Sequence, residues 1–270
     1  ALQNKEKVTI NTEVRNIHRT VGTLLGHEIT KVYGGSGLPR DTIEINMTGS
    51  GGQSLGAFIP SGMTMRLEGD TNDFLGKGLS GGRLIVRPPA LSHIDFVAED
   101  NIIAGNVLLY GATAGEVFIR GMVGERFCVR NSGAIAVVEG VGDHACEYMT
   151  GGKVIILGPT GRNFGAGMSG GMAYVYDPQG IFHRSLNTEM VDLEVSLSEE
   201  DTEFIREFLG HHVQETGSVI AEQVLQRWHQ NSRHFKKVMP KDYRRVLEAI
   251  SSAEEQGRNV EEAIMAASIR

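Results

Sequence analysis

The segment FLGKGLSGGRL, from Phe74 to Leu84, comes closest to a pattern for chemistry, because Gly76, Gly78 and Gly81 have GxGxxG spacing. A dinucleotide-binding loop with this spacing follows a strand and opens a helix, whose N-terminus holds the pyrophosphate. Here the glycines precede the apolar run RLIV, which is typical of a strand. No lysine followed by serine or threonine completes a Walker motif either. We therefore expect no phosphate site in this segment.

Histidine and cysteine offer two further candidates. His144 and Cys146 lie in GVGDHACEY, on an expected loop, but a closed zinc site needs four ligands. His211 and His212 occupy adjacent positions of an expected helix, so their side chains should diverge. No nucleophile-elbow motif indicates a Ser-His-Asp site. The sequence therefore predicts no catalytic and no metal-binding residue.

A basic cluster near the end of the chain is mixed with apolar residues. Its favoured interpretation is a solvated helix face, and the alternative is docking onto an acidic partner domain. The cluster consists of Lys236, Lys237, Lys241, Arg244 and Arg245.

Bulk composition narrows the class of protein. The chain has 270 residues and a net charge of -7, which disfavours a nucleic-acid partner. Cys128 and Cys146 provide neither a disulfide framework nor a CxxC pattern, as is usual in a reducing compartment. No run of about 18 apolar residues and no signal-peptide pattern is present. We expect a cytoplasmic protein that binds neither nucleic acid nor membrane.

A repeated phrase explains the glycines better than a ligand does. LSGG (79–82), MTGG (149–152) and MSGG (168–171) each lead into a short apolar run, and the last two copies are 19 residues apart. A period near 20 is too short for a propeller blade or a helical hairpin repeat. It favours one coil of a parallel β-helix per period. The predicted fold is mainly β, a single-stranded parallel β-helix of about seven coils.

Glycine has a structural role at the corners of such coils. A position with φ > 0, or with its backbone packed against the next coil, tolerates no Cβ. We predict these corners at Gly76, Gly78, Gly81, Gly82, Gly151, Gly152, Gly165, Gly167, Gly170 and Gly171.

Helical periodicity marks both ends of the chain. Apolar residues from Val21 to Val32 share one helical face, and Gly34 should end that helix. After Asp192 glycine becomes scarce, and Ser198 with Asp201 resembles a capping box. The predicted domains are an arm and capping helix (1–40), the β-helix (41–195) and a helical extension packed on it (196–270).

Three boundaries divide the helical extension. Gly217 should separate its first two helices, and Pro240 should begin the third. A short final helix or frayed tail is expected from Asn259 to Ile269.

Three long phrases resemble a known family. They are GDTNDFLGKGLSGGRLIVRPP, GERFCVRNSGAIAVVEGVGDHACEYMTGGKVIILGPTGRNFGAGMSGGMAYVYD and HVQETGS. They are similar to the carboxy-terminal GXGXG domain of the glutamate synthase large (alpha) subunit, over about residues 16–247. A weaker resemblance is to the GXGXG subunit of formylmethanofuran dehydrogenase.

The glutamate synthase resemblance implies a right-handed β-helix. It also implies a parent oxidoreductase that makes two L-glutamate from L-glutamine and 2-oxoglutarate with NADPH or ferredoxin, in glutamate biosynthesis and ammonia assimilation. The parent's FMN and iron-sulfur cluster belong to other domains. The family's glutaminase nucleophile is an N-terminal cysteine, whereas this chain begins with Ala1, and its two cysteines are 18 residues apart. We expect no cofactor in this chain.

The family's GXGXG domain implies a scaffolding role, with the glutaminase and FMN-binding synthase domains as partners. The first hypothesis is therefore a non-catalytic domain of glutamate synthase. The alternatives are a free-standing β-helix enzyme, or a GXGXG subunit of another oxidoreductase such as formylmethanofuran dehydrogenase.

Overall fold

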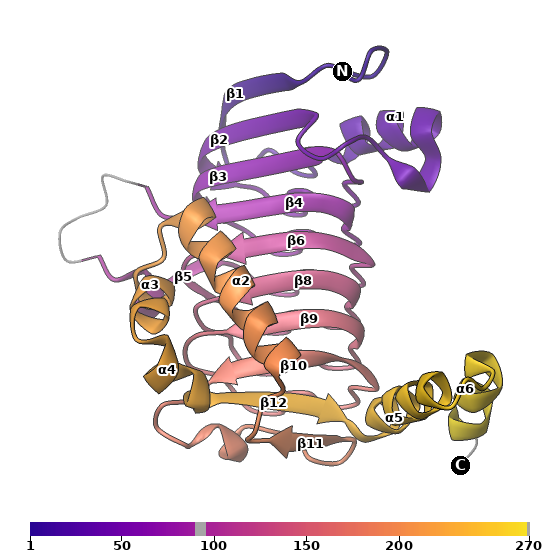
Figure 1. Cartoon of the computed structure of the whole chain (residues 1–270). Coiled ribbons are helices and arrows are strands. Elements are labelled where there is room, and N and C mark those ends of the chain that lie inside the picture. The colour runs from indigo at the N-terminus through magenta and orange to yellow at the C-terminus, as the bar shows by residue number, and fades with distance from the viewer. Residues whose placement is uncertain (90–95, 269–270) are drawn as a thin grey trace.

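Strands and turns alternate along most of the chain, and long helices follow them (Figure 1). The computed structural model describes residues 1–89 and 96–268. The strands are β1 (Val8–Val14), β2 (Ile43–Gly51), β3 (Met63–Thr71), β4 (Ser80–Arg87), β5 (Ile102–Ala104), β6 (Ala114–Ile119), β7 (Met122–Val123), β8 (Ser132–Val138), β9 (Thr150–Ile156), β10 (Gly170–Tyr176), β11 (Val191–Glu194) and β12 (Phe235–Pro240). The helices are α1 (Thr23–Tyr33), α2 (Glu199–Thr216), α3 (Val219–Gln226), α4 (Trp228–Asn231), α5 (Lys241–Glu255) and α6 (Val260–Ser268).

Within the described residues, twelve strands form one sheet, in the order β1-β2-β3-β4-β6-β8-β9-β10-β12-β11. The strands from β1 to β10 along this path are parallel to their neighbours, whereas β12 is antiparallel to both β10 and β11. The short strands β5 and β7 pair beside the main path. Most of the parallel pairs join segments about one sequence period apart, whereas β1 pairs with β2 (Val8 with Ile43) and β4 with β6 (Leu84 with Val117) across longer connections.

The two faces of the sheet bury different side chains. One row in register forms an inner face, and all of its members except Ile10 on the edge strand belong to the large buried cluster beneath the turns. From the edge strand inward this inner row consists of Ile10, Ile45, Met65, Leu84, Val117, Ala136, Val154, Ala173 and Val238. On the outer face a second buried cluster joins Ile85, Phe118 and Tyr174 to residues of α2 and α3. Because successive strand residues face opposite sides, both layers come from the same strands.

The predicted single-stranded parallel β-helix of about seven coils is wrong. The structure has one twelve-strand, mostly parallel sheet with helices against it, an arrangement of the α/β kind. The prediction assumed two or three strands in each period, but each period forms one long strand, and the extra strands β5 and β7 have three and two residues. The rest of a period consists of turns. Residues such as Ser54, Phe58 and Phe74 have φ of 61°, 60° and 63°, which does not continue a strand.

The turns still stack on one another. The N–H of Ser54 donates to the carbonyl of Asp73 at 2.9 Å, and that of Phe58 donates to Lys77 at 2.9 Å. These bonds satisfy backbone groups that the turns would otherwise bury unpaired. They explain why a period of about 20 residues is visible in the sequence although its product is a single sheet.

Most expected helices are present. Helix α1 ends at Tyr33 before Gly34, and Ser198 and Asp201 form the capping box of α2. Gly217 ends α2 in a left-handed conformation, and α5 follows Pro240. Helix α6 covers most of the expected final helix, while Ile269 lies outside the described residues.

Sequence patterns missed β12, which carries part of the basic cluster back into the sheet. Its residues had been interpreted as a helix face. No helix among residues 1–89 and 96–268 is long and apolar enough to cross a membrane.

Candidate functional site

The outer face of the sheet changes character along one register row, here named the outer row. Its members, from the edge strand inward, are Asn11, Asn46, Arg66, Ile85, Phe118, Val137, Ile155, Tyr174 and Lys237. The members on β1–β3 are polar, and those on β4–β10 are apolar or aromatic. Helix α2 contacts β4, β6 and β8 and lies across this second part (Figure 1). The sequence therefore encodes where the helix covers the sheet.

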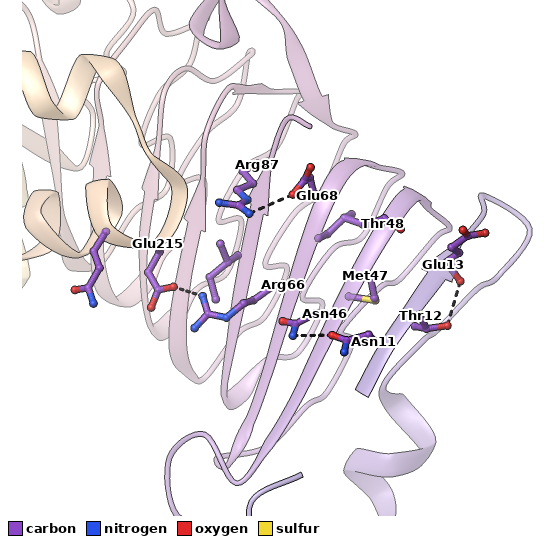
Figure 2. A pocket seen from close by; sticks show the side chains of 13 residues that line it. Asn11, Thr12, Glu13, Asn46, Met47, Thr48, Arg66, Glu68, Arg87 and Glu215 are labelled. Atoms are coloured by element: carbon purple, nitrogen blue, oxygen red, sulfur yellow. Dashed lines mark hydrogen bonds and ion pairs between the residues drawn. The ribbon is translucent and has the colours of Figure 1, made fainter. Parts of the chain in front are cut away.

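An open groove of about 740 Å³ occupies the uncovered part of the outer face (Figure 2). It lies over β1–β4 and is bounded by the last turn of α2. Side-chain pairs cross its floor: Asn46 donates to Asn11 at 3.1 Å, and Arg87 donates to Glu68 at 3.2 Å. The lining residues are Asn11, Thr12, Glu13, Asn46, Met47, Thr48, Arg66, Leu67, Glu68, Ile85, Arg87, Gln214 and Glu215.

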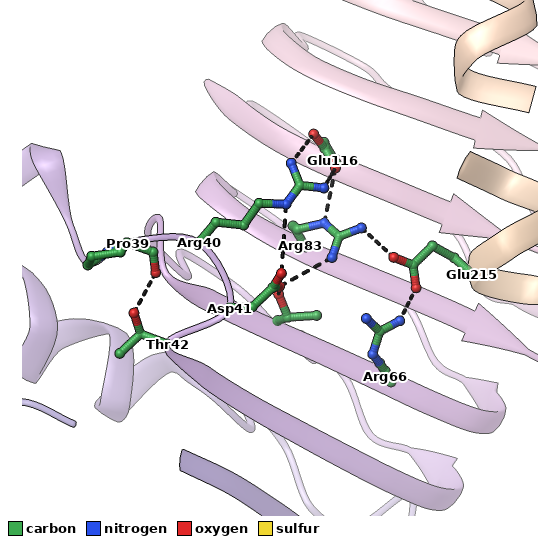
Figure 3. A network of polar contacts seen from close by, with 9 residues as sticks. Pro39, Arg40, Asp41, Thr42, Arg66, Arg83, Glu116 and Glu215 are labelled. Atoms are coloured by element: carbon green, nitrogen blue, oxygen red, sulfur yellow. Dashed lines mark hydrogen bonds and ion pairs between the residues drawn. The ribbon is translucent and has the colours of Figure 1, made fainter. Parts of the chain in front are cut away.

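A polar network centred on Arg83 joins this groove to a second one on the same face (Figure 3). The Arg83 side chain is only 8% exposed and donates to three carboxylates. The distances are 3.0 Å from Nε to Glu116, 3.3 Å from Nη1 to Asp41 and 2.6 Å from Nη2 to Glu215. Arg66 also bonds Glu215. Since Glu215 belongs to α2, the network ties the end of that helix to β3, β4 and β6.

Arg40 completes the network from the turn before β2. It donates to both oxygens of Glu116, at 3.0 and 2.9 Å, in the bidentate geometry that suits a guanidinium. Thr64 donates to Asp41 at 2.6 Å. Three arginines therefore face three carboxylates, and the charges balance locally.

Two carboxylates of the network, Glu215 and Asp41, have a pKa below the ordinary value. Burial alone would raise the pKa of Glu215, but hydrogen bonds from Arg66 and Arg83 and the charges of both guanidiniums lower it below its ordinary value. The pKa of Asp41 is lowered in the same way, with Thr64 and Arg83 outweighing burial. Groups kept ionised by fixed partners are poor general acids, because general acid catalysis needs a pKa near the working pH. The geometry suits the recognition of a partner surface by side chains whose charges do not change.

The residues of the glycine segment do not fit a phosphate. Gly81 and Gly82 belong to β4, so the segment opens a strand and not a helix. A Cβ at Gly78 would lie 2.3 Å from Phe58, and one at Gly81 would lie 2.2 Å from Ser61. The space on the Cβ side of these glycines is filled by Phe58 and Ser61 of the preceding turn.

The predicted corner glycines divide into two groups in the structure. Positive φ occurs at Gly76, Gly78, Gly81, Gly152, Gly165, Gly167 and Gly171. The other three are excluded from bearing a side chain by contact. A Cβ would lie 2.6 Å from Ile59 at Gly82, 2.2 Å from the Ser132 carbonyl at Gly151, and 2.2 Å from the Thr150 carbonyl at Gly170.

The structure brings Cys128 and Cys146 close together, but both are fully buried. Burial raises the pKa of each thiol above its ordinary value. Among the described residues no group of three or more His, Cys, Asp and Glu side chains could hold a metal ion. His144 pairs instead with Glu147, at 2.7 Å.

His211 and His212 have different environments. His212 is fully buried, and its Nε2 lies 3.4 Å from Oε1 of the buried Glu139. Ser218, which caps α3, donates to the same carboxylate. The hydrogen bond from Ser218 to Glu139, next to the end of β8, is a second link between the helices and the sheet, after the network around Arg83.

The basic cluster is not a solvated helix face. Lys237 is buried and donates to Asp201 at 2.8 Å, and Tyr174 donates to the same carboxylate at 2.6 Å. Arg244 pairs with Asp192 and Glu194 of β11. Lys237 and Arg244 therefore hold α2, α5 and the last strands together.

The sequence patterns pointed to none of the residues of the Arg83 network. The available signal was Arg83 itself, a charged residue in the apolar run RLIV. Its partners are separated from it by 33, 42 and 132 residues, so only the fold identifies them.

Comparison with known proteins assigns the family. A model described as the GXGXG motif matches residues 1–241. The chain belongs to the GXGXG family. Its relatives include the glutamate synthase [NADH] of Schizosaccharomyces pombe, which is 52% identical over 93% of this chain and 12% of the relative. The large chain of the Bacillus subtilis glutamate synthase [NADPH] is 48% identical over 98% of this chain and 17% of the relative.

A third relative is named for a different electron donor, ferredoxin. The ferredoxin-dependent glutamate synthase of Pyropia yezoensis is 44% identical over 89% of this GXGXG chain and 15% of the relative. The chain thus spans only 12–17% of the length of these relatives. The match is to one segment of each of these longer relatives.

Proposed function

We propose that this chain is a non-catalytic scaffolding domain of a glutamate synthase, which holds a glutaminase domain and an FMN-binding synthase domain in position. The parent enzyme would make two L-glutamate from L-glutamine and 2-oxoglutarate. One observation carries the proposal: glutamate synthases named for NADH, NADPH and ferredoxin all contain a segment 44–52% identical to nearly the whole chain. A segment shared across different electron donors suits a function common to all of them.

The site chemistry supports this proposal. On the outer face, the charged side chains of the Arg83 network neutralise one another, and the groove beside them is lined by no Cys, His or Lys. Such a surface suits contact with another protein domain, because balanced charges fix orientation at little net cost. FMN and the iron-sulfur cluster would then be bound by other parts of the polypeptide.

The free-standing β-helix enzyme is not carried forward, because it required a groove along a β-helix and the fold is a twelve-strand sheet.

Complementation tests the proposal. A Bacillus subtilis glutamate synthase large chain that lacks the matching segment is mixed with this chain supplied as a separate protein. Glutamine-dependent formation of glutamate from 2-oxoglutarate should appear only in the mixture. This chain alone should neither hydrolyse glutamine nor retain FMN on a desalting column. Glutamine hydrolysis by the chain alone, or full synthesis by the shortened large chain alone, would refute a scaffolding role.

A further inference from the structure

The two edge strands of the sheet, β11 and β1, differ in length and in how far other residues protect them. At one edge β11 has only four residues, and two of them, Asp192 and Glu194, pair with Arg244 of α5. At the other edge β1 has seven residues, six of which are exposed. No strand among the described residues pairs with its outer side (Figure 1). A long, uncovered edge is a template for another strand unless it is protected.

The backbone of β1 offers hydrogen bonds on its open side. The N–H of Val8 donates to the carbonyl of Thr42 at 2.9 Å, so Val8 faces β2. Because backbone groups alternate in direction along a strand, Thr9, Asn11 and Glu13 direct their N–H groups away from β2. The sequence VTINTEV contains no lysine and no proline, two of the residues that commonly protect an edge.

The apolar side chains of β1 that continue the inner face remain partly exposed at the edge of the sheet. Ile10 is 41% exposed, although its neighbours in register, Ile45 and Met65, are 7% and 1% exposed. Val8 is 37% exposed beside Ile43, which is buried. One more strand carrying apolar residues at alternate positions would cover Ile10 and Val8 and extend the same core.

We propose that the open edge of β1 receives an extended segment from the remainder of the glutamate synthase polypeptide, by β-strand addition. This inference rests on the proposed function. Its occupant follows from the relatives, in which the matching segment is only 12–17% of the chain, so most of the polypeptide lies outside it. The added strand presents apolar side chains toward Val8 and Ile10 and polar ones toward Asn11 and the groove.

The test compares hydrogen exchange at β1 in two proteins. One is this chain alone, and the other is the Bacillus subtilis large chain in which this chain replaces the matching segment. The peptide Val8–Val14 should exchange at least about tenfold more slowly in the replacement protein, because its outward amides become bonded. Peptides covering β8 and β9 should be equally protected in both, which shows that the domain is folded.

Thr9→Pro provides the matched variant. It removes an outward N–H without breaking the bonds from β1 to β2, and proline is tolerated on that side of an edge strand. In the replacement protein Thr9→Pro should return the amides of Asn11 and Glu13 toward the rates of the isolated chain. Thr9→Val keeps the N–H and should retain the protection.

The outcomes are distinguishable. Unprotected β1 in a replacement protein that still makes glutamate overturns the strand addition and leaves the proposed function standing. Protection that appears in the isolated chain as its concentration rises assigns the edge to a second copy and overturns the proposed occupant. A folded replacement protein that makes no glutamate overturns the proposed function and this inference with it.

Discussion

The outer face over β4–β10 and the outer face over β1–β3 belong to one continuous ladder of strands, but they carry different side chains. In the first region Phe118 and Tyr174 are buried against α2 and the elements beside it. In the second, Asn46 and Arg66 occupy the same row and line the open groove, where α2 reaches only as far as the contact between Glu215 and Arg66. The ladder is continuous between the two regions. The difference shows that the outward residue at one register position, and not the strand itself, decides whether a helix covers the sheet.

The largest expected effect comes from the covered region. Phe118→Ala removes a ring that stacks on Phe208 at 6.4 Å and has no exposed surface. Its loss should lower the free energy of unfolding by about 3–5 kcal/mol. Urea denaturation of both proteins measures the change.

Asn46→Ala in the same row is the matched control. Asn46 lies in the open groove, so its removal should change the free energy of unfolding by no more than about 0.5 kcal/mol. Equal losses from the two variants would contradict the division of the outer face into a covered and an open region.

A second test concerns the polar tie that fixes the start of α2. Asp201 accepts hydrogen bonds from Lys237 and Tyr174 and completes the capping box with Ser198. Asp201→Ala leaves the buried Lys237 ammonium with only the more distant Glu194, 3.7 Å away, which should cost about 3 kcal/mol. Thermal unfolding of the variant measures the loss.

The double variant Asp201→Ala with Lys237→Met separates the pair from the cap. It removes the buried charge as well, so it should recover part of the stability lost by the single change. If the double variant is no more stable than Asp201→Ala, the unpaired charge is not the source of the loss.

A third test compares how closely neighbouring strands pack in the open and in the covered region. A Cβ at Gly69 in the open region would meet the Gly49 carbonyl at 1.8 Å, and one at Gly151 in the covered region would meet the Ser132 carbonyl at 2.2 Å. Alanine at either position should lower the free energy of unfolding by about 1–3 kcal/mol. Unfolding curves of the two variants make the comparison.

Gly210 of α2 is the control, because a Cβ there meets nothing within 4 Å. Gly210→Ala should stabilise the protein by about 0.5–1 kcal/mol. If Gly69→Ala were harmless while Gly151→Ala destabilised the protein, strand packing would be loose in the open region.

Sequence patterns located β4, β9 and β10 because these strands begin within the repeated phrases LSGG, MTGG and MSGG. They also located the ends of α1 and α2, because Gly34 and the capping box around Ser198 are local signals. They did not give the number of strands in a period. That number depends on residues such as Phe58 that adopt a left-handed backbone conformation with positive φ. The type of a residue other than glycine does not predict this conformation.

The candidate site was not predictable from local patterns. Arg83 and Glu215 are 132 residues apart and meet only because α2 returns across the sheet. The strand Phe235–Pro240 was missed for a related reason, since its lysines resemble a solvated face until Asp201 is placed beside Lys237. Long-range pairing of this kind carries no spacing signal.

The smallest expected effect lies where the two regions meet, at Glu215. Hydrogen bonds from Arg66 and Arg83 outweigh burial and place its folded-state pKa below the ordinary 4.5. A lowered pKa contributes stability that is present above the unfolded-state value and is lost as the pH falls through the folded-state value. Stability of the wild-type chain should therefore fall as the pH drops below about 4.5. Part of that slope should be missing in Glu215→Gln.

At neutral pH Glu215→Gln should cost only about 1 kcal/mol, because the amide oxygen still accepts one hydrogen bond while the charge attraction is lost. Glu207→Gln on the exposed side of α2 is the matched control and should keep the wild-type pH profile. Melting temperatures measured from pH 7 down to pH 3 compare the three proteins. A Glu215→Gln profile that follows the wild type at every pH would mean that the ion pairs at the end of α2 do not anchor the helix, and that the apolar row beneath it sets the boundary alone.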